Sequence, residues 1–161
     1  MKQYYIVIDK IKIGSTNLDI ADIPMGIIFG KLNFEGIQSG YDFFLKYCTE
    51  NKIEITHYKE DKLILTSYIP NLSVINENGK QISGIGCCIS GMDNNDFEIT
   101  IEGIPYPLFE KEFPHHVALY KTQFKDVSTT KEKIKPTKKS FYGISRNLFK
   151  TGSNYFFSLL T

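Results

Sequence analysis

The chain has 161 residues, of which 42% are hydrophobic and 23% are charged, and its formal net charge is +1. This composition excludes wholesale disorder, and the length is that of one domain. No stretch approaches the roughly 18 to 20 uninterrupted apolar residues that a membrane span needs, and the apolar run at the N-terminus is too short for a secretory signal. We therefore expect a cytoplasmic protein.

The charge is divided unevenly along the chain. Residues 1–125 carry 12 Lys and Arg against 16 Asp and Glu, a net of −4, whereas residues 126–161 carry 7 against 2, a net of +5. The sequence thus predicts an acidic globular domain at 1–125, a basic linker at 126–140 and an amphipathic aromatic segment at 141–161. The sign of the charge is a guide to binding partners, although not to the fold.

The first elements of the chain are predicted to be strands. β-branched residues and near alternation indicate a strand from Tyr4 to Ile13, and a second strand from Met25 to Phe34. Gly26 and Gly30 inside the second strand indicate a bulge or the close approach of another backbone.

A helix is predicted at about 40–50. Ser39 supplies a capping hydroxyl just before the helix starts, and Asp42 places a carboxylate in its first turn. Apolar side chains then recur at positions i, i+3, i+4 and i+7. This stripe, which is suited to packing against a sheet, consists of Tyr41, Phe44, Leu45 and Cys48.

Strands return after this helix. The pair Asn78-Gly79 predicts a two-residue type I′ hairpin, in which Ile75 lies opposite Ile82. The last strand alternates strictly between apolar and polar residues, which predicts one buried face and one solvent-exposed face. The predicted strands are 53–58, 63–68, 72–76, 81–90 and 97–101.

A second short helix is predicted at about 115–124, with Pro114 at its first position. Together the elements predict an α+β fold, in which a mainly antiparallel sheet of about six to eight strands is packed on one face by the helix at 40–50. Hairpins carried by one helix leave a sheet face and a sheet edge exposed, and such surfaces are suited to binding another protein.

The histidines do not form a recognisable metal-binding motif. His115 and His116 lie beside Glu110 and Glu112. Adjacent residues on a helix diverge by about 100°, however, whereas helical zinc ligands are spaced so that one ion is reached from one face. We therefore interpret the two histidines as helix-start or surface residues, and we predict no metal and no cofactor.

The cysteines are three in number, and two of them are adjacent. Neighbouring residues of a strand point to opposite faces, so an adjacent pair does not reach one partner. This usage is typical of buried free thiols in a reducing compartment, and we predict no catalytic residue among them. They are Cys48, Cys87 and Cys88.

The basic C-terminal segment has three interpretations. Its lysines and aromatic residues could bind nucleic acid, which the acidic sign of the domain disfavours, or they could lie on an anionic membrane surface. The charge pattern favours the third, in which the segment folds back on the acidic domain or on a second copy of the chain. Its expected contacts are Phe141, Ile144, Leu148, Tyr155 and Phe156.

We expect a non-enzymatic bacterial protein-binding module. An immunity-type protein that neutralises a cognate toxin fits a small acidic domain without a catalytic motif. The alternative is a structural subunit of a phage tail or secretion apparatus, whose C-terminal arm docks on a neighbouring subunit; an enzyme of unfamiliar design is the remaining possibility. The expected partner contacts are Tyr58, Tyr68, Asp93, Asp96, Glu98 and Glu102.

Overall fold

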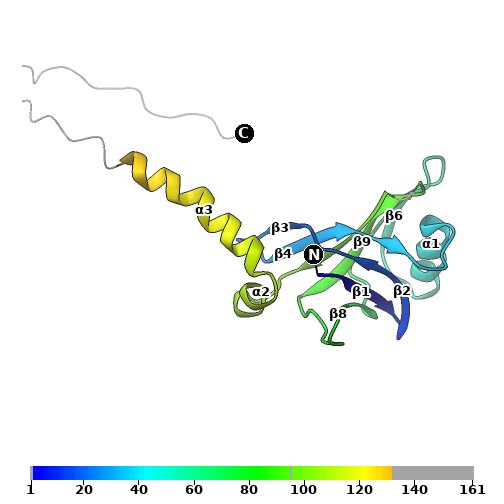
Figure 1. Ribbon diagram of the computed structural model, residues 1–161. Coiled ribbons are helices and arrows are strands. Elements are labelled where there is room, and N and C mark those ends of the chain that lie inside the picture. Colours follow the sequence, from blue (N-terminus) through cyan, green and yellow to red (C-terminus); the bar gives the residue numbers. More distant parts are fainter. Residues whose placement is uncertain (1, 95, 132–161) are drawn as a thin grey trace, which may run out of the picture.

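The computed structural model describes residues 2–94 and 96–131, with side chains described up to residue 123, and these residues form two antiparallel sheets and three helices (Figure 1). The helices are α1 (Gly40–Glu50), α2 (Tyr106–Glu112) and α3 (Pro114–Lys131). The strands are β1 (Tyr4–Ile8), β2 (Ile11–Thr16), β3 (Ile20–Asp22), β4 (Ile27–Lys31), β5 (Asn33–Phe34), β6 (Ile55–Tyr58), β7 (Leu63–Thr66), β8 (Leu72–Asn76), β9 (Gly86–Met92) and β10 (Asp96–Glu102).

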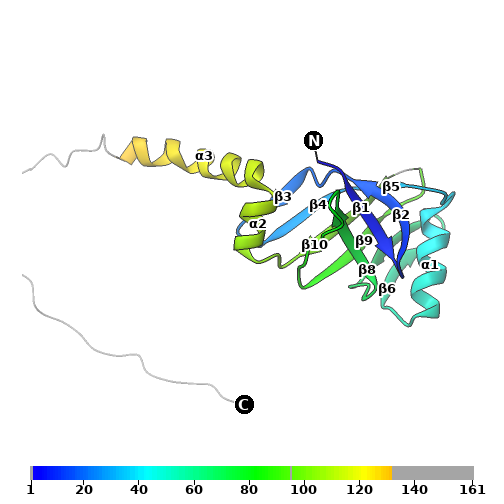
Figure 2. The same cartoon turned by 60° about the horizontal axis from the view of Figure 1, so that its bottom comes forward.

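The described strands form a four-stranded sheet with the order β5-β2-β1-β8 and a six-stranded sheet with the order β3-β4-β10-β9-β7-β6. The two sheets share one apolar core, to which β1 contributes Tyr4 and Ile6 and β10 contributes Phe97 and Ile99. Helix α1 lies at one end of the sheets, and α2 with α3 lies at the opposite end (Figures 1 and 2). The predicted α+β class and antiparallel pairing are confirmed, but the strands divide between two sheets instead of forming one.

The predicted strand from Tyr4 to Ile13 is wrong as a single element. The chain reverses at Asp9 and Lys10, whose φ angles are 48° and 70°, and β1 pairs with β2 as a hairpin. Two consecutive positive φ angles are the mark of a type I′ turn, which Asn and Gly usually supply. Tyr47 of α1 donates a hydrogen bond of 2.7 Å to Asp9 Oδ2, so a contact from outside the hairpin supports this turn.

The predicted strand from Met25 to Phe34 divides into β4 and β5, and the close approach expected at its glycines is confirmed. A Cβ atom built on Gly30 would lie 2.8 Å from the Cα of Leu18. A Cβ on Gly26, whose φ is 64°, would lie 2.7 Å from the carbonyl oxygen of Ile104. Both positions therefore exclude a side chain, because real Cβ atoms do not approach backbone atoms this closely.

Helix α1 begins and ends as predicted. Ser39 is its N-cap, and the Ser39 hydroxyl oxygen accepts a hydrogen bond of 3.0 Å from the N–H of Asp42. The Phe44 ring lies 6.2 Å from the Phe97 ring between centroids, which joins the helix to the six-stranded sheet. Three side chains of the predicted stripe are buried and the fourth is half-buried: Tyr41, Phe44 and Cys48, and then Leu45.

A turn at Asn78-Gly79 is present, but its predicted register is wrong. The carbonyl of Asn76 accepts a hydrogen bond of 2.8 Å from the N–H of Gly79, and the N–H of Asn76 donates one of 2.9 Å to the carbonyl of Lys80, so the loop between Asn76 and Lys80 has three residues. Gly79 has a φ of 74° and closes that loop in the left-handed conformation that glycine adopts readily. The isolated bridge therefore joins Ile75 to Gln81 and not to the predicted partner Ile82.

The remaining predicted strands correspond to observed ones, with shifted ends. The predicted strand at 81–90 changes most, because β9 begins only at Gly86. A Cβ on Gly84 would collide with the carbonyl oxygen of Glu102, so the segment before β9 crosses close to the end of β10 instead of pairing regularly with β8.

Helix α2 has no counterpart in the sequence analysis. Pro105 is its N-cap, and Pro107 lies in its first turn, where the missing N–H leaves no hydrogen bond unmade. Phe109 and the residue that follows the helix, Phe113, are both buried. Two prolines that resemble helix breakers in the sequence thus start a helix here.

The predicted helix at about 115–124 corresponds to α3, which begins at Pro114 as expected and continues to Lys131. Helix α3 therefore extends into the segment 126–140, for which the sequence predicts a basic linker. Helix α3 projects away from the two sheets in both views (Figures 1 and 2). The rest of the linker and the segment 141–161 lie outside the described residues, and with them the expected contacts Phe141, Ile144, Leu148, Tyr155 and Phe156.

Candidate functional site

The six-stranded sheet has one face turned to the core and one turned outward. In β10, Phe97, Ile99 and Ile101 are buried, and the polar residues between them point outward, as the alternation predicts. Strand register extends this division to the neighbouring strands, because directly paired residues share a face. Glu98 pairs with Lys31 of β4, for example, and both side chains lie on the outward side.

Exposed apolar side chains lie on this outward side. Ile20 is 52% exposed, Tyr58 55%, Leu65 43% and Met92 39%. Phe29 lies between Ile20 of β3 and Thr100 of β10 in one cross-strand row. These exposures show that none of the described elements covers the outward side, whereas Phe44 of α1 packs on the inward Phe97.

The charged groups on the same side are mostly negative. A groove of about 320 Å³ at one end of this surface has Ile20, Lys31 and Glu98 among its lining residues. We call the outward surface the acidic face, since it presents four carboxylates and one ammonium together with the exposed apolar side chains named above. Its charged residues are Asp22, Asp96, Glu98, Glu102 and Lys31.

Four of the six expected partner contacts lie on the acidic face, although they come from two strands. Tyr58 ends β6 at one edge of the sheet, and Asp96, Glu98 and Glu102 lie along β10. The last three share this face because residues at i, i+2 and i+6 of one strand point to the same side, although the predicted strand began only at Phe97. The sequence contains no comparable signal for Tyr58, since strand order decides its position.

Tyr68, the fifth expected contact, lies at the margin of the acidic face. It follows β7, and its hydroxyl donates a hydrogen bond to Oε2 of Glu102. The Tyr68 ring lies over Gly86, since a Cβ on Gly86 would be 2.5 Å from Tyr68 Cγ. This hydrogen bond, burial and the charge of Glu102 raise the pKa of Tyr68.

Asp93, the sixth expected contact, supports helix α1. Its carboxylate accepts hydrogen bonds of 2.7 Å from the Ser39 hydroxyl and 3.0 Å from the Tyr41 N–H, and Lys62 lies 3.2 Å away. Burial raises the pKa of Asp93, but these bonds and the Lys62 charge outweigh it, and the pKa is below its ordinary value. The carboxylate is thus engaged within the fold, which the sequence could not show because Asp93 lies 54 residues from Ser39.

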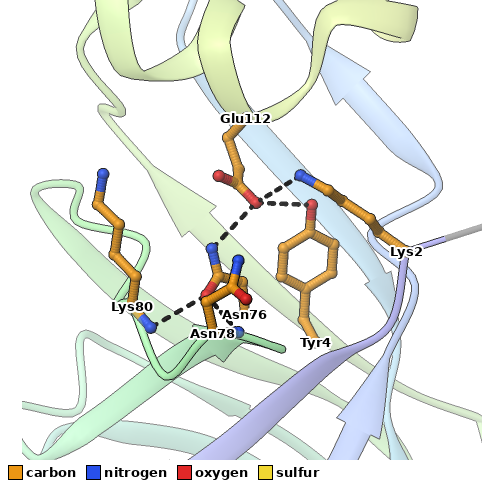
Figure 3. A network of polar contacts seen from close by, with 6 residues as sticks. All are labelled: Lys2, Tyr4, Asn76, Asn78, Lys80 and Glu112. Carbon is orange, nitrogen blue, oxygen red and sulfur yellow. Dashed lines mark hydrogen bonds and ion pairs between the residues drawn. The ribbon is translucent and has the colours of Figure 1, made fainter.

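A second polar cluster centres on Glu112, the last residue of α2 (Figure 3). The Glu112 side chain is 8% exposed, and its Oε1 accepts hydrogen bonds of 3.1 Å from Lys2 Nζ, 3.3 Å from the Tyr4 hydroxyl and 3.4 Å from Asn76 Nδ2. Burial raises the pKa of Glu112, but the three donors and the Lys2 charge outweigh it, so the pKa lies below its ordinary value. The cluster joins the N-terminal strand, the end of β8 and α2.

The sequence does not indicate this cluster as a unit. There Glu112 is notable only as a neighbour of the histidine pair, whereas its donors come from positions as far as 110 residues away. A carboxylate in the last turn of a short helix carries no local signal of burial. Only the packing of α2 against the ends of β1 and β8 brings the donors to it.

The histidine pair opens α3, as expected, but only His115 lies at the surface. His116 is buried, and its Nε2–H donates to the carbonyl oxygen of Leu18 at 3.0 Å. Burial, followed by His116 and Lys2, lowers the pKa of His115. Glu110 points elsewhere and pairs with Lys121 at 2.8 Å. Within residues 2–94 and 96–131, no group of three or more His, Cys, Asp or Glu is placed to hold a metal ion.

The three cysteines are free thiols, as expected, and two of them are buried. Burial raises the pKa of Cys48 to about 11, and burial with the neighbouring Cys88 raises the pKa of Cys87 to about 11. Cys87 points inward and Cys88 outward, in agreement with the expected alternation. Both buried thiols therefore stay protonated at neutral pH, where only the thiolate is a good nucleophile.

Comparisons of this chain with protein-family models, with curated proteins and with solved structures find no match. Among the helices that the structure describes, none combines the length and the apolar character that crossing a bilayer requires.

Proposed function

We propose that the protein is a non-enzymatic bacterial protein-binding module, and specifically an immunity-type protein that neutralises a cognate toxin in the cytoplasm. The observation that carries the proposal is the uncovered acidic face of the six-stranded sheet. Its charged side chains are four carboxylates and one ammonium, and its exposed side chains include Ile20, Tyr58, Leu65 and Met92.

The composition of the acidic face favours a partner with a basic surface. Opposite electrostatic potentials speed the encounter of two proteins and fix their relative orientation. The carboxylates of the acidic face supply this attraction to a basic partner. The apolar side chains and Tyr58 supply area that becomes buried on binding, and aromatic residues are frequent anchors of protein interfaces. A toxin that acts on nucleic acid carries such a basic surface, because it must attract phosphates.

The chemistry of the cysteines supports a binding function more than a catalytic one. A nucleophilic cysteine needs an electropositive setting that lowers the thiol pKa. Here the pKa values of Cys48 and Cys87 rise to about 11. His57, in turn, is engaged with the Tyr41 hydroxyl at 2.9 Å.

Co-expression with the product of the adjacent gene tests this proposal. We expect a stable complex that elutes as one species on size-exclusion chromatography and loses affinity as the salt concentration rises, because charge attraction is screened. The charge reversals Glu98→Lys and Glu102→Lys are expected to weaken that complex by at least about tenfold. If the protein elutes separately from the product of the adjacent gene, and that product is folded, the proposal is contradicted.

One observation favours the second candidate, a structural subunit of a phage tail or secretion apparatus. Helix α3 spans 18 residues and projects away from the sheets (Figure 2). An arm of this kind is suited to docking on a neighbouring subunit. Under this function, truncation after residue 125 abolishes self-association, whereas under the first it leaves the toxin complex intact.

A further inference from the structure

A cavity of about 270 Å³ lies at the Glu112 cluster, away from the cysteines. Its walls come from three separate parts of the chain: the residues at the start of β1, the loop between β2 and β3, and the junction of α2 with α3. The lining residues that carry polar groups include Lys2, Tyr4, Asp19, Glu112 and His115.

The carboxylate of Glu112 is buried and needs a cation, because an unpaired charge away from water is costly. Its cation is the ammonium of Lys2, which precedes β1 and has a side chain that is 55% exposed. The bond between them measures 3.1 Å, longer than the about 2.7–2.9 Å of a strong charge-assisted bond. The buried Glu112 carboxylate is thus paired with an ammonium that can move away into solvent, because the Lys2 side chain is exposed.

One oxygen of the Glu112 carboxylate makes none of the three described side-chain hydrogen bonds. All three described bonds go to Oε1 of Glu112, and Oε2 takes part in none of them (Figure 3). Asp19 adds a second carboxylate to the cavity lining, and Pro114 adds an apolar surface. Two carboxylates and one ammonium line the described part of the cavity, so its charge favours a cationic ligand over an anionic one.

A guanidinium group fits this chemistry better than other cations. It is planar, always charged and weakly hydrated, and its fork of N–H donors can bond both oxygens of one carboxylate. The ammonium of Lys2 reaches only one oxygen of Glu112. A guanidinium on an alkyl stem could bond Oε1 and Oε2 together while the stem lies against Pro114.

We propose that this cavity is a binding site for an alkylguanidinium, which displaces the Lys2 ammonium from Glu112. The group belongs either to a small molecule or to an arginine side chain of another protein. Asp19 also lines the groove of about 320 Å³ at the end of the acidic face, so the cavity adjoins that surface. The proposal stands apart from the proposed function, because a small guanidinium tests it in the absence of any partner protein.

Isothermal titration calorimetry with four ligands tests the site. Butylguanidinium and its neutral isostere butylurea represent the small molecule; the capped peptide Gly-Arg-Gly and its citrulline counterpart represent the side chain. We expect saturable binding of at least one guanidinium ligand and none of either neutral isostere. Tighter binding of butylguanidinium assigns a small molecule, and tighter binding of the peptide assigns an arginine side chain. Absence of saturable binding by both guanidinium ligands, in the wild type and in Lys2→Ala, overturns the proposal.

The variants separate a binding site from a merely structural cluster. Glu112→Gln is expected to weaken binding by at least about tenfold, since it removes the charged acceptor. Lys2→Ala is expected to tighten binding because it removes the competing ammonium, and this gain is the result that a structural role does not produce. Asp19→Asn, at an exposed position, weakens binding even where Glu112→Gln fails to fold. Lys12→Ala, whose ammonium pairs with Glu35 at 2.7 Å, is the control and leaves binding unchanged.

Lys2→Ala tests whether the ligand displaces the Lys2 ammonium, and the two carboxylate variants together test whether the cavity is the binding site. Equal or weaker guanidinium binding by Lys2→Ala overturns the displacement, and binding that survives both Glu112→Gln and Asp19→Asn overturns the site. Circular dichroism of each variant establishes that it is folded before titration.

Discussion

The Tyr68 hydroxyl donates a hydrogen bond to Glu102 Oε2, and the Tyr68 ring lies over Gly86 between them in the sheet. The two residues are 34 positions apart, one following β7 and the other ending β10. Gly86 of β9 pairs with Glu102, and because Gly86 has no side chain, the Tyr68 ring can lie over it and reach the carboxylate. The contact holds an aromatic ring at the margin of the acidic face.

This contact predicts the direction of a pKa change. Glu102→Gln removes a charged acceptor from the Tyr68 hydroxyl, so the pKa of Tyr68 is expected to fall toward the ordinary tyrosine value of 10.0. NMR titration of the Tyr68 ring resonances measures it. Glu98→Gln, on the same strand, is the control and leaves the Tyr68 pKa in place. Equal Tyr68 pKa values in Glu102→Gln and the wild type contradict the hydrogen bond.

The Glu112 cluster predicts how stability depends on pH. The folded pKa of Glu112 lies below the ordinary value of 4.5, so the unfolded chain binds more protons in the window just below pH 4.5. The stabilisation by Glu112 is therefore complete at neutral pH and is lost as the pH falls through that window. Urea unfolding at a series of pH values is expected to show this decrease in the wild type.

Glu112→Gln removes the titrating group from the same cluster. It is expected to lower the free energy of unfolding at pH 7 by about 1–3 kcal/mol, because the charged acceptor of three donors is lost. The variant also loses less stability on acidification, so its curve and that of the wild type converge at low pH. Parallel curves contradict the assignment of this slope to Glu112.

Asp93 is predicted to stabilise the start of helix α1, although it lies far from that helix in the sequence. Asp93→Ala leaves the Ser39 hydroxyl and the Tyr41 N–H without their shared acceptor. Loss of a comparable helix cap costs about 1–2 kcal/mol, which thermal or urea unfolding measures. Asp96→Ala, three residues further and exposed, is expected to change stability by less than about 0.5 kcal/mol. Equal effects of the two substitutions contradict the capping role.

Gly30 predicts a steric effect. The Cβ of Gly30→Ala would lie 2.8 Å from both the N and the Cα of Leu18, and backbone atoms cannot swing aside as a side chain can. We expect a loss of about 1–3 kcal/mol in the free energy of unfolding, as for other overpacked positions. Ser90→Ala on the outward side of β9 is the control, with an expected change of under about 0.5 kcal/mol. A fully stable Gly30→Ala contradicts the close approach.

Local signals in the sequence predicted the elements that depend on local chemistry. Helix α1 follows from the Ser39 hydroxyl and a stripe of apolar residues, and the outward face of β10 follows from strict alternation. The turn at Asp9 and Lys10 could not be predicted, because lysine seldom adopts a positive φ angle and a contact from Tyr47, distant in the sequence, supports the turn.

The site residues divide in the same way. Alternation placed Glu98 and Glu102 on one face, whereas strand order decided the position of Tyr58, and packing of distant segments decided the environments of Asp93 and Glu112. Charge and type identify a carboxylate as a candidate contact, but only tertiary structure shows whether its oxygens already have partners.

The central claim is that the acidic face binds a protein with a basic surface. The most direct measurement is the affinity of the partner protein for the double variant Glu98→Lys and Glu102→Lys at two salt concentrations. The control is Glu50→Lys, at the end of α1. We predict that the double variant binds at least about tenfold more weakly at low salt and loses the salt dependence, while Glu50→Lys binds as the wild type does. An unchanged affinity for the double variant contradicts the claim.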